Sequence, residues 1–219
     1  MRILLYLLIW SALLFLPNRL LTTAPVHEYL GLIFLLLGGL HLYLVRHYLY
    51  ALVMRRLPMT PLNAVNVVML FLLVIVIMTG ILISLYAVPV VRLRGLTSIC
   101  VHAVHLSASI LFFLIVGIHA GFHWRSMRQA ILHHLPVNIP AALSRIPDGI
   151  GVLLISAGLY AFTTTHLYEK ILWEHLSFGG IGGTWAYQCD LLLIFLGCMS
   201  AAVLFERLRK RNTDIEKAP

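Results

Sequence analysis

Charged residues are scarce in this chain of 219 residues, and acidic residues are the scarcest of all. Asp and Glu number 8 and Lys and Arg 16, so charged residues make up 11% of the sequence, against about 25% in a typical soluble domain. Hydrophobic residues make up 61%. So few charges cannot cover a surface that faces water, which excludes a soluble globular enzyme, a disordered chain and a nucleic-acid-binding domain. The composition favours a protein embedded in a lipid bilayer.

The signatures of several common cofactor and metal sites are also missing. Cys100, Cys189 and Cys198 form neither a Cys-x-x-Cys-His sequence for covalent haem attachment nor the spacing of a zinc finger. No Gly-x-Gly-x-x-Gly sequence for a nicotinamide nucleotide is present. We therefore interpret the cysteines as small apolar residues in helices, and we expect no nucleotide-binding domain.

Long apolar segments are what the chain does contain. A bilayer needs roughly 20 apolar residues per helix, and six segments meet or approach this length: Ile3–Leu21, Ala24–Val45, Ala64–Val91, Val101–Phe122, Ile150–Leu167 and Ala186–Phe205. The first resembles the start of a signal peptide, but no convincing cleavage site follows it, so we expect it to remain as a helix. The sequence predicts an all-α polytopic membrane protein with six transmembrane helices.

The apolar segments also suggest how the chain is divided. We expect a four-helix core over residues 1–125, a cytoplasmic connection over 126–149, two further transmembrane helices over 150–207 and a basic cytoplasmic tail over 208–219. Within the connection, Met127–Leu135 mixes basic and apolar residues, which predicts a segment lying on the membrane surface.

Lys and Arg are distributed unevenly between alternate loops. If the N-terminus is cytoplasmic, four basic residues face outside, namely Arg19, Arg92, Arg94 and Lys170, and the other twelve of the 16 face the cytoplasm. Basic residues accumulate on the cytoplasmic side of membrane proteins. We therefore expect both termini to lie in the cytoplasm.

Four histidines on two of the apolar segments repeat one spacing. His27 and His41 are fourteen residues apart, and so are His105 and His119. Fourteen residues of helix are nearly four turns, so each pair shares a face and spans about 21 Å along the axis. Because one helix separates the two segments, they run in the same direction. Facing each other, they would place His27 level with His105 and His41 level with His119.

The two segments also match between and beside these histidines. Aligned without gaps, His27–His41 and His105–His119 superpose Phe34 on Phe112 and Gly39 on Gly117. The small residues Gly31 and Ser109, each four residues after the outer histidine, would leave room for a macrocycle. The pattern predicts a four-helix bundle with two cofactor levels and an aromatic layer between them.

Two imidazoles facing each other at each level are typical axial ligands of a porphyrin iron. We therefore predict two non-covalent haem b groups, one held by His27 and His105 and the other by His41 and His119, with the Phe34 and Phe112 layer on the electron path between them. The haem propionates require cations. Arginine suits carboxylates, and the candidates are Arg92 and Arg94 at the outer end and Arg46 and Arg125 near the inner end. Each of them is also explained by anchoring at the membrane surface.

Other interpretations of the histidines stay open. His102 is an alternative outer ligand and His123 an alternative inner ligand, or a residue touching a propionate or a quinone. A divalent metal-ion permease would also use intramembrane imidazoles, although it would call for carboxylates near them. A non-catalytic membrane anchor would use the histidines only to pack its helices.

Three stretches resemble a known family, the flavinylation-associated cytochromes: HEYLGLIFLLLGGLH (27–41), MTGILIS (78–84) and VHLSASILFFLIVGIHAGFHW (104–124). The resemblance implies a small bacterial dihaem b-type membrane cytochrome with a ferric-reductase-like or cytochrome-b-like core. It also implies electron transfer between quinol, or a donor on the cytoplasmic side, and an extracytoplasmic acceptor that carries flavin. The chain would then be an electron-transfer subunit rather than a self-contained enzyme.

Overall fold

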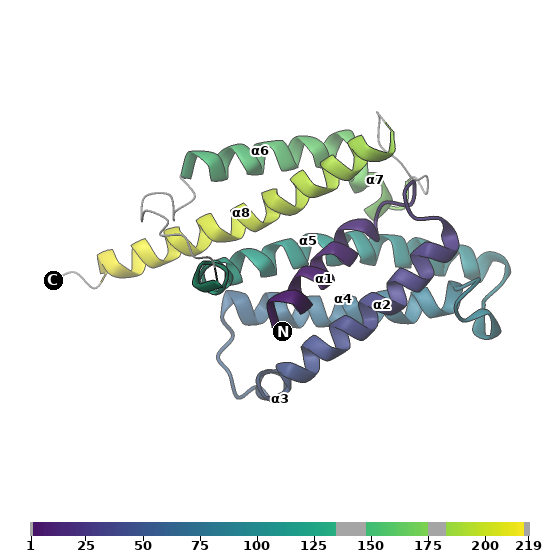
Figure 1. Cartoon of the computed structure of the whole chain (residues 1–219), viewed down its shortest axis with the longest axis horizontal. Coiled ribbons are helices and arrows are strands. Elements are labelled where there is room, and N and C mark those ends of the chain that lie inside the picture. The colour runs from purple at the N-terminus through teal and green to yellow at the C-terminus, as the bar shows by residue number, and fades with distance from the viewer. Residues whose placement is uncertain (1, 135–147, 175–182, 217–219) are drawn as a thin grey trace.

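The computed structural model describes residues 2–134, 148–174 and 183–216, and within these ranges the chain is all-helical (Figure 1). The helices are α1 (Arg2–Phe15), α2 (Ala24–Leu44), α3 (Arg46–Val53), α4 (Pro61–Ile83), α5 (Gly95–His134), α6 (Asp148–Thr164), α7 (Leu167–Ile171) and α8 (Thr184–Glu216), with a 3-10 turn η1 (Pro89–Val91). Most of the predicted connection and the end of the predicted tail lie outside the described residues.

Four of the described helices are long and apolar enough to cross a membrane. They are α2, α4, the segment Gly95–Gln129 of α5 and the segment Thr184–Asn212 of α8. The apolar parts of α1 and α6, Leu4–Phe15 and Gly149–Thr164, are shorter. These helices confirm the predicted membrane protein of all-α class.

Proline residues and one polar cap account for several of the helix ends. Pro17 follows the end of α1, which is why this helix ends at Phe15 and does not reach the predicted Leu21. At α4, the Thr60 side chain accepts a hydrogen bond from the Asn63 backbone N–H, and Pro61 occupies the first turn. The helix therefore begins before the predicted Ala64. The prediction that it continues to Val91 is wrong, because it ends at Ile83 and η1 begins at Pro89.

Helix α5 is longer than the sequence suggested. We expected a span over Val101–Phe122 and a separate surface segment over Met127–Leu135, but one helix of 40 residues runs from Gly95 to His134. The prediction of a separate surface segment is therefore wrong, because these residues continue α5. Between Phe122 and His134 the chain contains neither proline nor glycine, so nothing interrupts the helical hydrogen bonds.

Helices α4, α5, α8 and α6 lie side by side, and α1 and α2 cross in front of α4 and α5 (Figure 1). The buried core gathers around α5 and α8, where Phe113, Leu191 and Phe195 are at most 3% exposed. Glycine allows these helices to approach closely, since a Cβ at Gly121 would collide with the backbone of Met199. In contrast, α2 contributes no buried residue, and Figure 1 shows it leaning away from α5 toward its carboxyl end, where α3 begins.

Candidate functional site

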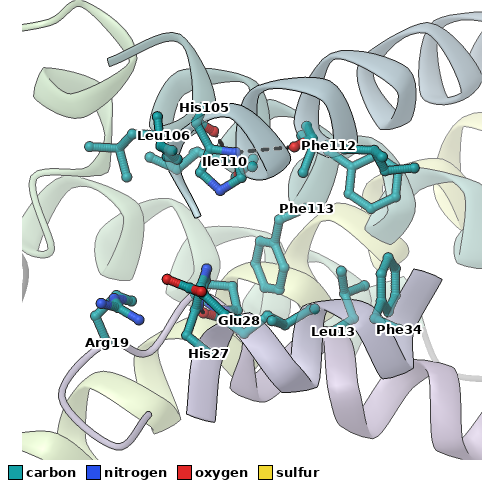
Figure 2. A pocket seen from close by; sticks show the side chains of 18 of the residues that line it. Leu13, Arg19, His27, Glu28, Phe34, His105, Leu106, Ile110, Phe112 and Phe113 are labelled. Atoms are coloured by element: carbon teal, nitrogen blue, oxygen red, sulfur yellow. Dashed lines mark hydrogen bonds between the residues drawn. The ribbon is translucent and has the colours of Figure 1, made fainter. Parts of the chain in front are cut away.

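A cavity of about 330 Å³ separates α2 from α4 and α5 in the half of the molecule that contains His27 and His105. Residues of α1, α7 and α8 complete its walls, and apolar side chains make up most of its lining. Phe34, Phe112 and Phe113 close the end that faces the middle of the molecule (Figure 2). The space therefore lies where the sequence predicted the outer cofactor level.

His27 and His105 face each other across this cavity. Their ring centres are 6.4 Å apart and their ring planes are inclined at 81°. Figure 2 shows the two rings projecting from opposite walls into the same space. The structure therefore brings together the two histidines that the sequence pattern paired.

Each of these imidazoles is held by its Nδ1 atom. The Nδ1 of His27 lies 3.0 Å from the Leu16 carbonyl oxygen, and that of His105 lies 3.1 Å from the Val76 carbonyl oxygen and 3.0 Å from Thr79 Oγ1. A carbonyl oxygen only accepts hydrogen bonds, so Nδ1 carries the proton and donates. The Nε2 atom of each ring is then the lone-pair nitrogen, as in metal-ligating histidines whose other nitrogen is bonded to a carbonyl.

The spacing of the rings can be compared with that of two axial ligands. A metal–imidazole bond of about 2.0 Å, plus roughly 1.1 Å from nitrogen to ring centre, places two opposite imidazoles about 6.2 Å centre to centre. The observed 6.4 Å agrees with this value. The distance between the two rings is therefore one that two imidazoles on opposite sides of a single metal would have.

Gly80 and Thr79 support His105, and neither was foreseen as a site residue. A Cβ added at Gly80 would lie 3.1 Å from His105 Cε1, so glycine leaves the imidazole the space it occupies. By contrast, a Cβ at Gly31, which lines the cavity as predicted, meets nothing within 4 Å. Ser109 also lines the cavity, and its hydroxyl donates to the His105 carbonyl oxygen at 2.6 Å.

Phe34 and Phe112 form the second predicted pair. Their ring centres are 6.1 Å apart with planes at 82°. Because this pair follows the histidine pair seven residues further along both helices, α2 and α5 run in the same direction and in the predicted register over this half. The Gly39 and Gly117 match does not extend to their surroundings, because a Cβ at Gly39 meets nothing within 4 Å whereas one at Gly117 would lie 2.8 Å from Cys198 Cβ.

The inner histidines are arranged differently. His119 donates from Nδ1 to Asn66 Oδ1 at 2.7 Å, and its ring centre lies 4.6 Å from that of His123. The His41 ring packs edge-on against Tyr6 at 5.6 Å, and its buried Nδ1 has no hydrogen-bond partner. Among the ring contacts of the described residues, none joins His41 to His119, although the two are close enough to interact electrostatically.

Asn66 belongs to a hydrogen-bonded chain that leads from His119 to the α3–α4 connection. Asn66 Nδ2 donates to Tyr48 Oη at 2.6 Å, Tyr48 Oη donates to Asn63 Oδ1 at 2.6 Å, and Asn63 Nδ2 donates to the Pro58 carbonyl oxygen at 2.7 Å. The sequence carried a signal for this chain that we did not use, because two asparagines in an otherwise apolar helix are costly unless they are paired.

The cations that line the outer cavity are not Arg92 and Arg94, the two that the sequence predicted for the outer end. Arg92, Arg94 and Arg125 are exposed, and Arg46 donates to the Tyr43 carbonyl oxygen and lies over the Tyr43 ring. None of these four lines the described cavity, whereas Arg19, Lys170 and the alternative ligand His102 do. Lys170 lies outside the spans and is 3% exposed. Burial lowers the pKa of Lys170, and the Glu169 carboxylate partly opposes this shift.

In the described part of the chain, no three or more His, Cys, Asp or Glu side chains are placed to hold a metal ion together. Two facing imidazoles suit a porphyrin, in which the macrocycle supplies the remaining ligands of the metal.

Comparisons of the chain with protein-family models, curated proteins and solved structures found no match.

Proposed function

We propose that this chain is a membrane electron-transfer cytochrome with two haem b groups. His27 and His105 would be the axial ligands of the outer haem, and His41 and His119 those of the inner one. The observation that carries the proposal is the outer pair, with ring centres 6.4 Å apart across an apolar cavity and both Nδ1 atoms held. His102 and His123 remain the alternative ligands at the two levels.

The chemistry of this donor set favours electron transfer over oxygen chemistry. Two imidazoles leave no open position on the iron, and the haem would supply one-electron oxidation and reduction. The chain's own residues orient the imidazoles through their Nδ1 bonds and keep water away with apolar walls. The Phe34 and Phe112 rings lie between the two levels, as proposed for the electron path.

We further propose that six helices cross the membrane, with α1 and α6 joining the four longer ones. At 1.5 Å per residue, the 14 residues of α1 and the 17 of α6 extend about 21 and 26 Å, slightly less than a hydrocarbon core of about 30 Å. The excess of basic residues in alternate loops supports cytoplasmic termini in a bacterial inner membrane.

The resemblance to flavinylation-associated cytochromes supports a place between two redox partners. Quinol or a cytoplasmic-side protein would be the donor, and an extracytoplasmic flavoprotein the acceptor. The chain would act as a subunit of an electron-transfer system rather than as a self-contained enzyme.

The test is an optical spectrum of the purified full-length protein, reduced minus oxidised, combined with a haem assay per polypeptide. We expect sharp b-type bands and two haems per chain. A divalent metal-ion permease would instead lack these bands and bind zinc or nickel, and a non-catalytic anchor would bind neither. Either of these results would contradict the proposed function.

A further inference from the structure

The wall of the outer cavity holds two cationic side chains that ligation by histidine does not explain. Arg19 lies between α1 and α2, and Lys170 lies on α7. Both line the cavity that contains His27 and His105, and Figure 2 shows Arg19 beside His27. Two segments distant in the sequence therefore bring positive charge to one space.

Lys170 is held firmly in this wall. Ser107 donates a hydrogen bond from Oγ to the Lys170 carbonyl oxygen at 3.0 Å, which ties α7 to α5, and the Trp173 indole N–H donates to the same Ser107 Oγ at 2.7 Å. The Lys170 ammonium nitrogen lies 5.6 Å from the centre of the Tyr187 ring. A lysine that is only 3% exposed is stabilised by nearby anionic groups, and the Glu169 carboxylate on the same helix is one of them.

The carboxylate of the described cavity wall is already engaged elsewhere. The Glu28 oxygens accept hydrogen bonds from the Ser84 hydroxyl and from the backbone N–H groups of Leu85, Tyr86 and Ala87, at 2.7 to 3.0 Å. Glu28 thus holds the turn that follows α4. Among the described residues that line the cavity, Arg19 and Lys170 are the Lys and Arg side chains and Glu28 is the carboxylate, which also attracts Arg19.

We propose that Arg19 and Lys170 form a carboxylate-binding site in the outer cavity, in place of Arg92 and Arg94. The inference rests on the proposed function, because the carboxylates would be the propionates of the outer haem. The arginine offers a two-pronged donor and the lysine a point charge. A free carboxylate compound entering the cavity is the other source of the same chemistry.

The test is a haem titration of the full-length chain, purified from haem-deficient cells. The ligands are haem b and its dimethyl ester, in which both propionates are blocked. The variants are Arg19→Gln and Lys170→Met, with Arg92→Gln and Arg94→Gln as matched controls outside the cavity. We expect each cavity variant to bind haem b at the outer site about tenfold less tightly than wild type. This is the effect expected for a lost hydrogen bond to a charged group. The controls should bind as wild type, and the ester should bind all five proteins equally.

A second measurement keeps the test independent of how well the haem-free variants fold. In protein purified with haem already bound, Arg19→Gln should lower the reduction potential of one haem and leave the other unchanged, because a nearby cation stabilises the reduced form. The Arg92→Gln control should change neither potential.

The outcomes distinguish failure of the carboxylate site from failure of the proposed function. Cavity variants that bind haem b like the controls overturn the assignment of the propionates to Arg19 and Lys170 and leave the cytochrome intact. A loss with the ester equal to that with haem b also overturns it. A wild-type chain that binds neither form overturns the proposed function, and the carboxylate site with it.

Discussion

The outer and inner ends of the α2–α5 pair carry the same histidine spacing in different surroundings. At the outer end, His27 and His105 face each other across a cavity and donate to backbone carbonyl oxygens. At the inner end, His119 donates to an asparagine side chain and His41 has a buried nitrogen without a partner. A repeat in the sequence therefore sets the register of two helices, whereas the neighbours of each histidine determine what the site can hold.

The largest expected effect is the loss of one haem on removing an outer ligand. His105→Ala should reduce the haem content by about half, because its removal leaves the iron with one protein ligand. The measurement is a pyridine haemochrome assay per polypeptide. His102→Ala, which changes another histidine of the same cavity wall, should retain both haems, and the reverse outcome would reassign the ligand.

The inner haem should be held less tightly than the outer one. Among the ring contacts of the described residues, His41 packs against Tyr6 and His119 against His123, so we expect haem binding to reorient at least one ring. We expect dilution into haem-scavenging globin to remove one haem roughly tenfold faster than the other. His119→Ala should abolish the fast phase and His123→Ala should preserve it. If the slow phase disappears in His119→Ala instead, the inner haem is the more tightly held one and the prediction is wrong.

A methyl group beside His105 should disturb the outer site alone. In Gly80→Ala the new Cβ would lie 3.1 Å from His105 Cε1, so the ring must shift by a few tenths of an ångström. We expect severalfold faster loss of the outer haem in the same assay, from a cost of about 1 kcal/mol. Gly39→Ala is the control, because its Cβ meets nothing within 4 Å. Equal behaviour of the two variants would show that Gly80 does not position His105.

The smallest expected effect concerns the potential of the inner haem. Asn66→Leu keeps the size of the side chain and removes the acceptor of the His119 N–H, which makes the imidazole a weaker electron donor. The potential should rise by about 40 mV, the equivalent of about 1 kcal/mol for one electron. Tyr48 is the next residue in the same series of hydrogen bonds, so Tyr48→Phe should shift the potential of the inner haem less. A two-component redox titration measures both, and a shift confined to the other component would contradict the assignment.

The sequence predicted correctly those features that depend on the residues of a single helix, such as its bounds and the face on which its side chains lie. The bounds of α2 were predicted within one residue, because Pro25 marks its first turn and an unbroken apolar run follows. The pairing of His27 with His105 followed from helical periodicity, which requires no knowledge of the neighbours.

The features that were missed depend on segments distant in the sequence. Arg19 reaches the cavity from the loop between α1 and α2, and Lys170 reaches it from α7, which a hydrogen bond ties to α5. No local pattern favours them over Arg92 and Arg94. The extension of α5 to His134 was missed for another reason. We predicted that the helix ends where polar residues begin, although no proline or glycine interrupts it there.

The most direct test of the account is the electron paramagnetic resonance spectrum of the oxidised protein. Ring planes inclined at 81° donate almost equally to two iron d orbitals and leave them nearly degenerate, so a low-spin ferric haem between these rings should show a highly anisotropic signal with a large maximum g value. This signal should vanish in both His27→Ala and His105→Ala. A high-spin ferric signal in the wild type, or a low-spin signal that survives both substitutions, would contradict ligation by the outer pair.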